Sequence, residues 1–383
     1  MLLKNCFPIL LLFIPSALSE TSSIDVEKLG AMIADDAYTS SRVCGSCHET
    51  IYASWKRSIH SLSLEDPIFD LAFMQALKID SEKARALCLR CHAPLTMETG
   101  DLSLKDSVTT EGVTCDFCHS VTDVVLDDKH KPYRSIVGGA KRGLLKQAES
   151  PVHEVVYSKL HGEAKFCAGC HLYTSDSGAI LIGTYQEWLE GPYASEGIVC
   201  QECHMARSSG YRVNPDVKLT SPGTHLHSLI HDSEQMKKAV AVKISDVKMI
   251  ANSLRVDVEI TNVGSGHMIP TGIPSRHLEL VVTVKGPGLK EAVSQRLVFQ
   301  KTVADKDGNL LASDAETLMN GESIVSDNRI GPREVRKNSL SFIISTGGPF
   351  DVSADVIYHY ASYVAERKLI KITMNSDKKT FRK

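Results

Sequence analysis

The sequence predicts an α+β protein in which a loop-rich helical part is followed by an antiparallel, immunoglobulin-like β-sandwich. Ten of the eleven cysteines of the 383-residue chain lie between positions 44 and 203, and none follows Cys203. After about position 232, short runs of alternating apolar residues take over, separated by turn-forming residues. This length suits two ordinary domains, which we expect at residues 20–235 and 236–383.

The first nineteen residues have the features of a secretory signal peptide. Lys4 gives a positive start, residues 7–18 are almost wholly apolar, and Ala17 and Ser19 are small residues before a cut at Glu20. No later run approaches the ~20 apolar residues of a membrane helix. We therefore expect an exported protein without a transmembrane segment in the mature chain, located in the periplasm or at the cell surface. The net charge of −3 gives no reason to expect nucleic acid as a partner.

Five segments of the helical part share the spacing Cys-x-x-Cys-His, and the eleventh cysteine, Cys6, lies in the leader. The pairs are Cys44 and Cys47, Cys88 and Cys91, Cys115 and Cys118, Cys167 and Cys170, and Cys200 and Cys203, followed by His48, His92, His119, His171 and His204. Two cysteines three apart lie on one side of a helical turn, where they can form thioethers to the two vinyl groups of a haem. The next histidine then supplies the proximal nitrogen to the iron. The spacing predicts five covalent haems c.

Two other uses of paired cysteines were weighed against haem attachment. Zinc ribbons also contain Cys-x-x-Cys, but each site uses two pairs, so five pairs leave one without a partner. Redox-active disulfides would not need a histidine after every pair.

The haem count determines how the helical part is built. Five motifs share about 160 residues, too little chain for a conventional core around each porphyrin. We expect haems that stack on one another, with short helices and loops around them, so residues 20–235 are predicted to form a pentahaem cytochrome c domain. Helical spacing predicts helices over residues 46–61, 68–77 and 81–89.

The sandwich is predicted from alternating apolar residues, which are typical of half-buried strands. Roughly six to eight short strands are expected. The clearest runs cover residues 239–244, 254–260, 278–284, 296–303, 339–345 and 352–364.

Each iron also needs a sixth ligand, and the chain offers ten further histidines. They are His60, His130, His153, His161, His225, His227, His231, His267, His277 and His359. His60 is the strongest candidate. If residues 48–60 form one helix, its two histidines are about 18 Å apart. That is too far to bind one iron from both sides, so His60 should serve a neighbouring haem. Trp55, between them, either packs on a porphyrin or is a plain core residue.

Several stretches resemble the multihaem cytochromes related to hydroxylamine oxidoreductase and to the tetrahaem cytochromes of ammonia oxidisers. The resemblance covers about residues 41–232. It is carried by the first motif followed by Trp55 and Ser58-Ile59-His60, and by Glu111-Gly112-Val113-Thr114, Ser150-Pro151-Val152-His153, Ser158-Lys159-Leu160-His161, Thr184-Tyr185-Gln186-Glu187-Trp188 and Gly197-Ile198.

The resemblance implies bis-His ligation across neighbouring haems, in closely stacked and near-perpendicular pairs. It favours His153 and His161 as distal ligands, and it places His227 where such chains often carry one. His225 and His231 lie beside His227, so the choice among these three stays open, as does His130. The stretch Gly264-Ser265-Gly266-His267-Met268-Ile269-Pro270-Thr271-Gly272 looks like the opening of the β domain of some multihaem cytochromes. His267 is either the fifth distal ligand or a turn residue at the domain interface.

Three classes of function remain after these observations. The favoured one is an electron carrier between redox partner proteins, with every iron six-coordinate. The second is a reductase or oxidase of a small nitrogen or sulfur compound, which needs one open iron. All five motifs end in histidine, without the lysine of a pentahaem nitrite reductase, and the surplus of histidines favours full ligation. The third is an oligomer, a subunit of a haem-conducting filament.

Overall fold

The computed structural model describes residues 26–33, 37–146, 148–211, 222–229, 233–287, 289–344, 347–360 and 371–382. The predicted leader, residues 1–19, and His231 lie outside these residues. None of the helices in the described ranges is long and apolar enough to cross a membrane.

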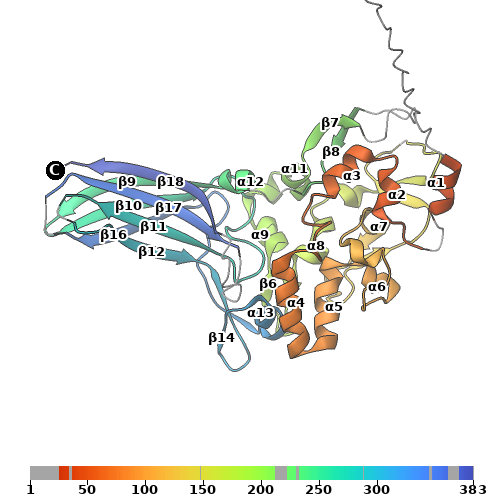
Figure 1. Cartoon of the computed structure of the whole chain (residues 1–383), viewed down its shortest axis with the longest axis horizontal. Coiled ribbons are helices and arrows are strands. Elements are labelled where there is room, and N and C mark those ends of the chain that lie inside the picture. Colours follow the sequence, from red (N-terminus) through yellow and green to blue (C-terminus); the bar gives the residue numbers. More distant parts are fainter. Residues whose placement is uncertain are drawn as a thin grey trace, which may run out of the picture.

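Short helices make up most of the amino-terminal part (Figure 1). They are α1 (Val26–Met32), α2 (Ser41–Gly45), α3 (Glu49–Trp55), α4 (Pro67–Ile79), α5 (Ser81–His92), α6 (Leu95–Thr99), α7 (Cys115–Ser120), α8 (Lys165–His171), α9 (Thr184–Glu190), α10 (Pro192–Ser195), α11 (Cys200–His204) and α12 (Ser233–Lys237), with 3-10 turns at Thr109–Glu111 and Lys159–Gly162. The longest two, α4 and α5, begin with aspartate caps: Asp66 accepts from the Ile68 amide, and Asp80 from Glu82 and Lys83.

Four small two-stranded sheets connect these helices. They pair β1 (Val121–Val124) with β2 (Tyr133–Ser135), β3 (Ala140–Gly143) with β4 (Glu154–Tyr157), β5 (Tyr173–Thr174) with β6 (Ile180–Ile182), and β7 (Arg207–Tyr211) with β8 (Pro222–His225). The sequence predicts short helices and loops here, without strands. Strands of two to five residues are too short to show an alternating pattern.

The carboxy-terminal part contains two antiparallel sheets. One has the order β16 (Val335–Ile343), β10 (Ser253–Asn262), β9 (Val240–Ile250). The other has the order β12 (Val293–Phe299), β11 (His277–Lys285), β17 (Phe350–His359), β18 (Lys371–Phe381). A small third sheet joins β14 (Leu310–Leu311), β13 (Lys301–Ala304) and β15 (Ser323–Asp327). Along the chain, helix α13 (Asp314–Asn320) lies between β14 and β15.

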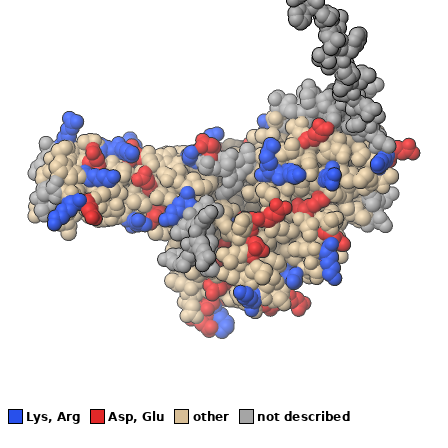
Figure 2. All heavy atoms as spheres, in the orientation of Figure 1, with Lys and Arg blue, Asp and Glu red and all other residues tan. Residues whose placement is uncertain are grey.

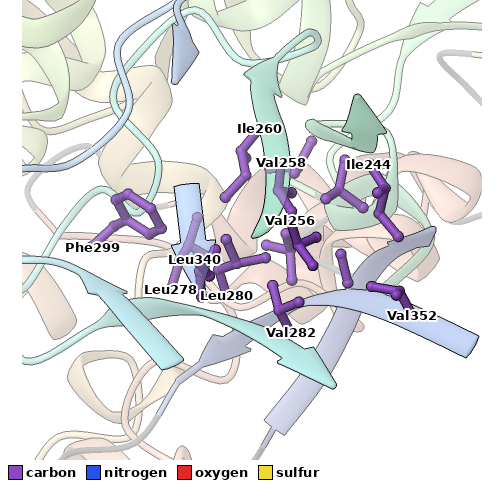
Figure 3. Close-up of a cluster of buried hydrophobic side chains, with 14 of the residues drawn as sticks. Ile244, Val256, Val258, Ile260, Leu278, Leu280, Val282, Phe299, Leu340 and Val352 are labelled. Atoms are coloured by element: carbon purple, nitrogen blue, oxygen red, sulfur yellow. The ribbon is translucent and has the colours of Figure 1, made fainter. Parts of the chain in front are cut away.

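Both large sheets contribute to one apolar core (Figure 3). Along β10, every second side chain from Leu254 to Ile260 is fully buried, and Leu280 and Val282 of β11 face them from the other sheet. The period of two places these residues on one face of each strand, and burial of that face holds the sheets together. The α+β composition is therefore confirmed, while the immunoglobulin-like outline stays a prediction.

Three expected elements differ from the observed ones. The helix expected over 46–61 is only α3, because the chain turns at the buried Trp55, whose indole donates to the Val113 carbonyl at 2.9 Å. The strand expected over 296–303 is interrupted at Gln300, so β12 and β13 belong to different sheets. The strand expected over 352–364 is β17, which ends at His359, and residues 361–364 are outside the described ranges.

The two parts of the molecule touch through buried side chains. Ala315 and Met319 of α13 pack against Ala76 of α4 and Ala84 of α5, so a helix from the β part completes a small helical core. Lys83 of α5 donates to the Met319 carbonyl at 2.7 Å. This contact brings the loops at one end of the large sheets close to the cysteine motifs (Figure 1).

Candidate haem-binding site

Each Cys-x-x-Cys-His segment lies on one helical turn, as its spacing requires. Four segments lie in α5, α7, α8 and α11, and residues 44–48 span the end of α2 and the turn after it. In α7 the Thr114 hydroxyl accepts from the Phe117 amide at 3.0 Å and caps the helix directly before Cys115. The two cysteines of each pair are therefore neighbours on one side of a turn.

Cysteines of different motifs also meet in pairs. The thiol of Cys44 is in hydrogen-bonding contact with Cys115, that of Cys91 with Cys170, and that of Cys167 with Cys200. Cys118 also lies close to Cys167. The first motif therefore adjoins the third, the third adjoins the fourth, and the fourth adjoins both the second and the fifth.

Two observations bear on the alternative uses of the cysteines. All ten that follow the leader are free of disulfides. Zinc needs several ligands that converge on one point. In the part of the chain that the structure describes, no three His, Cys, Asp or Glu side chains do so.

Three pairs of histidine rings lie at the separation expected of the two axial ligands of one haem iron. Ring centroids are 6.3 Å apart for His48 and His153, 6.3 Å for His60 and His171, and 6.5 Å for His204 and His267. An imidazole nitrogen binds a transition metal at about 2 Å and the ring centroid lies about 1 Å further out, so two axial imidazoles have centroids roughly 6 Å apart. The residues present therefore fit haem iron between each pair.

His60 reaches its partner because the chain approaches closely at Gly112. The His60 carbonyl accepts from the Val113 amide at 3.0 Å. A Cβ on Gly112 would lie 2.6 Å from that carbonyl oxygen, and the residue has φ +73°, so only glycine fits. The ring that faces His60, that of His171, belongs to the fourth motif and not to the nearby first. The role of His60 as a ligand of a neighbouring haem stays a prediction.

Two predicted distal ligands lie beside the same proximal histidine. The ring of His119 is 5.7 Å from His161 and 6.3 Å from His227. Both nitrogens of His161 are engaged, Nδ1 with the Ser158 hydroxyl and Nε2 with the Cys118 carbonyl. Nδ1 of His227 contacts the His225 carbonyl at 2.9 Å, so Nε2 remains available to bind a metal. The nitrogen contacts favour His227 as the partner of His119.

Carbonyl contacts fix the orientation of several other rings in the same way. Nδ1 contacts the carbonyl of Ser63 in His92, of Arg142 in His119, of Glu154 in His153 and of Met268 in His267. In His267 the Ser265 hydroxyl also lies 2.9 Å from Nδ1 and 3.4 Å from Nε2. A histidine that donates from Nδ1 presents Nε2 as the acceptor, which is the tautomer that coordinates metals. Burial lowers the pKa of His60 to about 3 and that of His171 and His227 to about 4, which keeps these rings in the neutral form.

His92, in the second motif, has a different neighbour. The ring of Phe69 stacks on it, with centroids 3.9 Å apart and planes inclined by 18°. The rings of the five predicted distal histidines lie beside His48, His119, His171 and His204. Arg276 is close enough to His92 to lower its pKa, after the larger effect of burial. The second motif therefore differs from the other four.

The remaining histidines lie elsewhere. His130 is exposed, and His225 has Nδ1 on the Met205 carbonyl at 2.7 Å. His277 and His359 stack on neighbouring strands of the large sheet, 4.3 Å apart.

Two buried charge clusters were missed by the sequence analysis. Asp116, between the cysteines of the third motif, pairs with Lys141 at 2.5 Å. Arg329 pairs with Asp327 and with Glu187 of α9. Partners 25 and 142 residues apart leave no pattern in the sequence, so only the fold could reveal them.

The comparisons with known proteins agree with this site. Residues 43–120, which hold the first three motifs, match the family model of cytochrome c554 and c-prime. The fold matches the crystal structure of a penta-heme cytochrome c552 from Thermochromatium tepidum with a TM-score of 0.74 at 21% identity, over 90% of this chain and 99% of that chain. A β-glucosidase from Kluyveromyces marxianus is also found, but its TM-score is 0.17 over 38% of this chain and 15% of that one, at 12% identity.

No curated protein matches the sequence. The family model covers the first three motifs, and the shared fold extends over both parts of the molecule. Together these findings support a multihaem c-type cytochrome. The more specific relation to hydroxylamine oxidoreductase stays a prediction.

Proposed function

We propose that the chain is an exported pentahaem cytochrome c that transfers electrons between redox partner proteins through bis-His haems. The observation that carries this proposal is the pairing of proximal histidines with histidines from other segments at the spacing of axial ligands. Bound haem c would supply one-electron redox chemistry. The cysteines of the five motifs would hold it, and the paired histidines would cap both faces of the iron.

Whether a histidine occupies the distal position of a haem iron decides whether a substrate can bind there. A distal imidazole oriented by a carbonyl keeps small molecules off the metal, so the capped sites favour electron transfer over substrate conversion. His/His ligation should place the potentials below those of His/Met cytochromes.

The cysteine contacts support an order for the haem sites. Contact of Cys44 with Cys115 and of Cys167 with Cys200, together with the proximity of Cys118 to Cys167, supports a row from the first motif through the third and fourth to the fifth. Contact of Cys91 with Cys170 attaches the second motif to the fourth as a branch. In this proposal the fourth motif, with its partner His60, is the junction of the array.

The fifth motif is our candidate for exchange with a partner. Cys203 is exposed, whereas the other nine motif cysteines are partly buried. Lysines, arginines and carboxylates are scattered over both parts of the molecule in the view of Figure 2. On this face no single sign of charge dominates.

A spectroelectrochemical titration tests this function directly. The purified holoprotein should take up five electrons per chain reversibly, in overlapping low-potential steps. Uptake of fewer electrons, or potentials in the range of His/Met cytochromes, would contradict the proposal.

The second candidate function, a reductase or oxidase of a small nitrogen or sulfur compound, is favoured by one observation. The second motif has Phe69 stacked on His92, and the predicted distal histidines pair with other motifs. Carbon monoxide added to the reduced protein separates the two functions. An unchanged spectrum supports the electron carrier, and a shift in about one haem of five supports an open site.

A further inference from the structure

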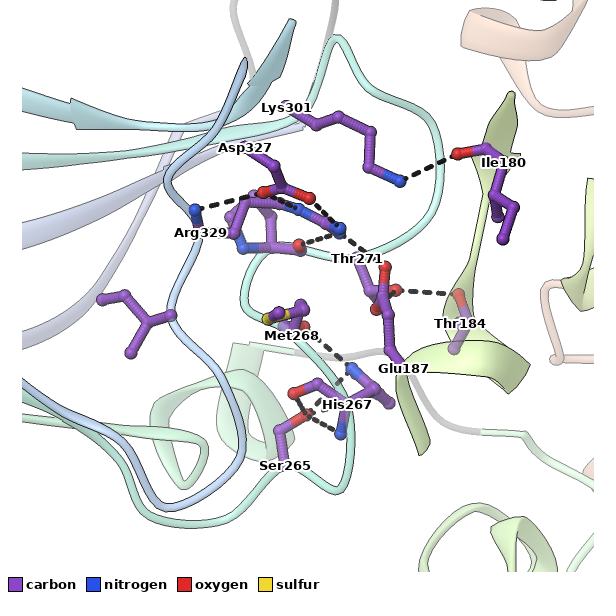
Figure 4. Close-up of polar contacts among 12 residues, drawn as sticks. Ile180, Thr184, Glu187, Ser265, His267, Met268, Thr271, Lys301, Asp327 and Arg329 are labelled. Atoms are coloured by element: carbon purple, nitrogen blue, oxygen red, sulfur yellow. Dashed lines mark hydrogen bonds and ion pairs between the residues drawn. The ribbon is translucent and has the colours of Figure 1, made fainter. Parts of the chain in front are cut away.

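The loop that carries His267 is held by both parts of the molecule (Figure 4). Within the β part, Asn262 donates to the His267 carbonyl at 2.9 Å, and Ile269 exchanges two backbone hydrogen bonds with Ile330. Against the helical part, Gly266 lies so close to Tyr193 that an added Cβ would be 3.3 Å from its ring. The place of His267 therefore depends on contacts between the two parts.

A buried ion bridge joins this loop to helix α9. The Arg329 side chain is 4% exposed, and its Nη1 donates to Glu187 Oε1 at 2.7 Å and to the Pro270 carbonyl at 3.0 Å. Its Nε and Nη2 donate to the two carboxylate oxygens of Asp327 at 2.8 and 2.7 Å. The other oxygen of Glu187 accepts from the Thr271 hydroxyl at 2.6 Å.

The bridge is anchored on both sides and balanced in charge. Lys301, also buried, donates from Nζ to the Ile180 carbonyl of β6 at 3.1 Å (Figure 4). The cluster thus holds two cations and two carboxylates. Buried charges that lose their partners are left without compensation for lost hydration, so the cluster strongly favours one arrangement. The planar guanidinium adds a fixed geometry to that preference.

We propose that the Glu187–Arg329–Asp327 bridge is the positioning device for His267, which keeps this imidazole opposite His204. The inference rests on the proposed function, in which His267 is an axial ligand. Pro270 and Thr271 follow His267 by three and four residues, so the bridge contacts the loop close to the imidazole. The bridge residues act through the loop, and loosening them should release His267 from the fifth haem site.

A second ion pair between the same two parts provides a matched control. Arg333 donates to both carboxylate oxygens of Glu196 at 2.6 and 2.7 Å. Its side chain is 50% exposed and that of Glu196 is 41% exposed. Arg333 also lies over the Tyr193 ring, 4.7 Å from its centroid, so the control variant is Glu196→Gln, which keeps that contact. Solvent-exposed pairs contribute little, so loss of this pair should not loosen the His267 loop.

The test compares Glu187→Gln, Thr271→Val, His267→Ala and Glu196→Gln in the holoprotein. Each variant is first checked for its haem count, then reduced and mixed with carbon monoxide in a stopped-flow spectrometer. We expect His267→Ala to gain one carbon-monoxide-reactive haem relative to wild type. Glu187→Gln should bind at that same haem roughly 10- to 100-fold faster than wild type, because a hydrogen bond to a charged group is lost. Thr271→Val should show a smaller increase, and Glu196→Gln should match wild type.

The outcomes separate the inference from the proposed function. If His267→Ala gains no reactive haem, the axial role of His267 is wrong and the positioning role is wrong with it. If His267→Ala gains one but Glu187→Gln and Thr271→Val behave like Glu196→Gln, the positioning role alone is overturned. If Glu187→Gln assembles with fewer haems, Thr271→Val decides, since it removes one hydroxyl and keeps the ion bridge.

Discussion

The buried pair of Asp116 and Lys141 allows a stability effect to be worked from the structure. The Asp116 carboxylate is fully buried and accepts from Lys141 at 2.5 Å, from the Thr39 amide at 2.6 Å and from the Ser120 hydroxyl at 3.2 Å. It therefore ties the third motif to the segment just before the first motif. Lys141→Met keeps the length of the side chain but leaves this carboxylate buried with two neutral donors.

The expected cost follows from the buried geometry. Removing one partner of a buried ion pair destabilises a protein by about 3–5 kcal/mol. Because two hydrogen bonds to the Asp116 carboxylate remain and the methionine is apolar, we expect a loss of stability at the lower end of this range, about 3 kcal/mol. The assay is urea unfolding followed by haem absorbance, in which the midpoint should fall while the denaturant slope stays unchanged.

Two further variants make the reasoning falsifiable. Lys165→Met removes the exposed ion pair with Asp123, whose side chains are 41% and 57% exposed, and should cost about 0–1 kcal/mol. Asp116→Asn combined with Lys141→Met removes both charges and should recover part of the loss. The reasoning is refuted if Lys141→Met is no more destabilising than Lys165→Met.

Three other predictions concern ligation, acid stability and the sheet core. His60→Ala should make about one haem in five reactive with carbon monoxide, because it removes the partner of His171. Stability should fall as pH drops below about 6.5, since unfolded histidines bind protons there while burial and the neighbouring His277 hold the folded pKa of His359 below its usual value. Leu280→Ala, at a fully buried position, should destabilise the sheets by about 2–5 kcal/mol and leave the visible spectrum unchanged.

Each of these has a result that would count against it. An unreactive His60→Ala protein would mean that His171 has another axial partner. A melting temperature that stays level or rises between pH 6.5 and 4 would mean that the buried His359 does not stay neutral. A changed haem spectrum in Leu280→Ala would mean that the sheet core and the haem sites are coupled.

The features that could be predicted from the sequence are those encoded within a few neighbouring residues. The Cys-x-x-Cys-His segments are complete in five positions, and the structure places each on one turn. The alternation from Leu254 to Ile260 is visible in the sequence because one face of β10 is buried. The expected helix over 68–77 is α4, which extends to Pro67 and Ile79.

The features that could not be predicted depend on contacts between distant residues. The end of α3 at Trp55 is set by a carbonyl 58 residues away. Strand β18 is mostly polar, without a sustained apolar alternation, and it forms by pairing with β17. Helix α13 has little apolar pattern of its own, and it packs on α4 and α5 from the far part of the chain.

The distal ligands lie between these two cases. The resemblance pointed to His153, His161 and His227, but a spacing in sequence does not say which proximal histidine each one faces. The structure places His161 and His227 beside His119, and a Phe ring on His92. Which motif receives which histidine depends on how the segments cross, and that is decided by tertiary packing.

The most direct test of the account combines a haem count with the identity of the axial ligands in the wild-type protein. A pyridine haemochrome assay counts the haems per chain, and near-infrared magnetic circular dichroism of the oxidised protein distinguishes His/His from other ligand pairs. The account predicts five haems c per chain, at least four of them with bis-His ligation. Fewer than five haems, or fewer than four bis-His sites, would contradict it.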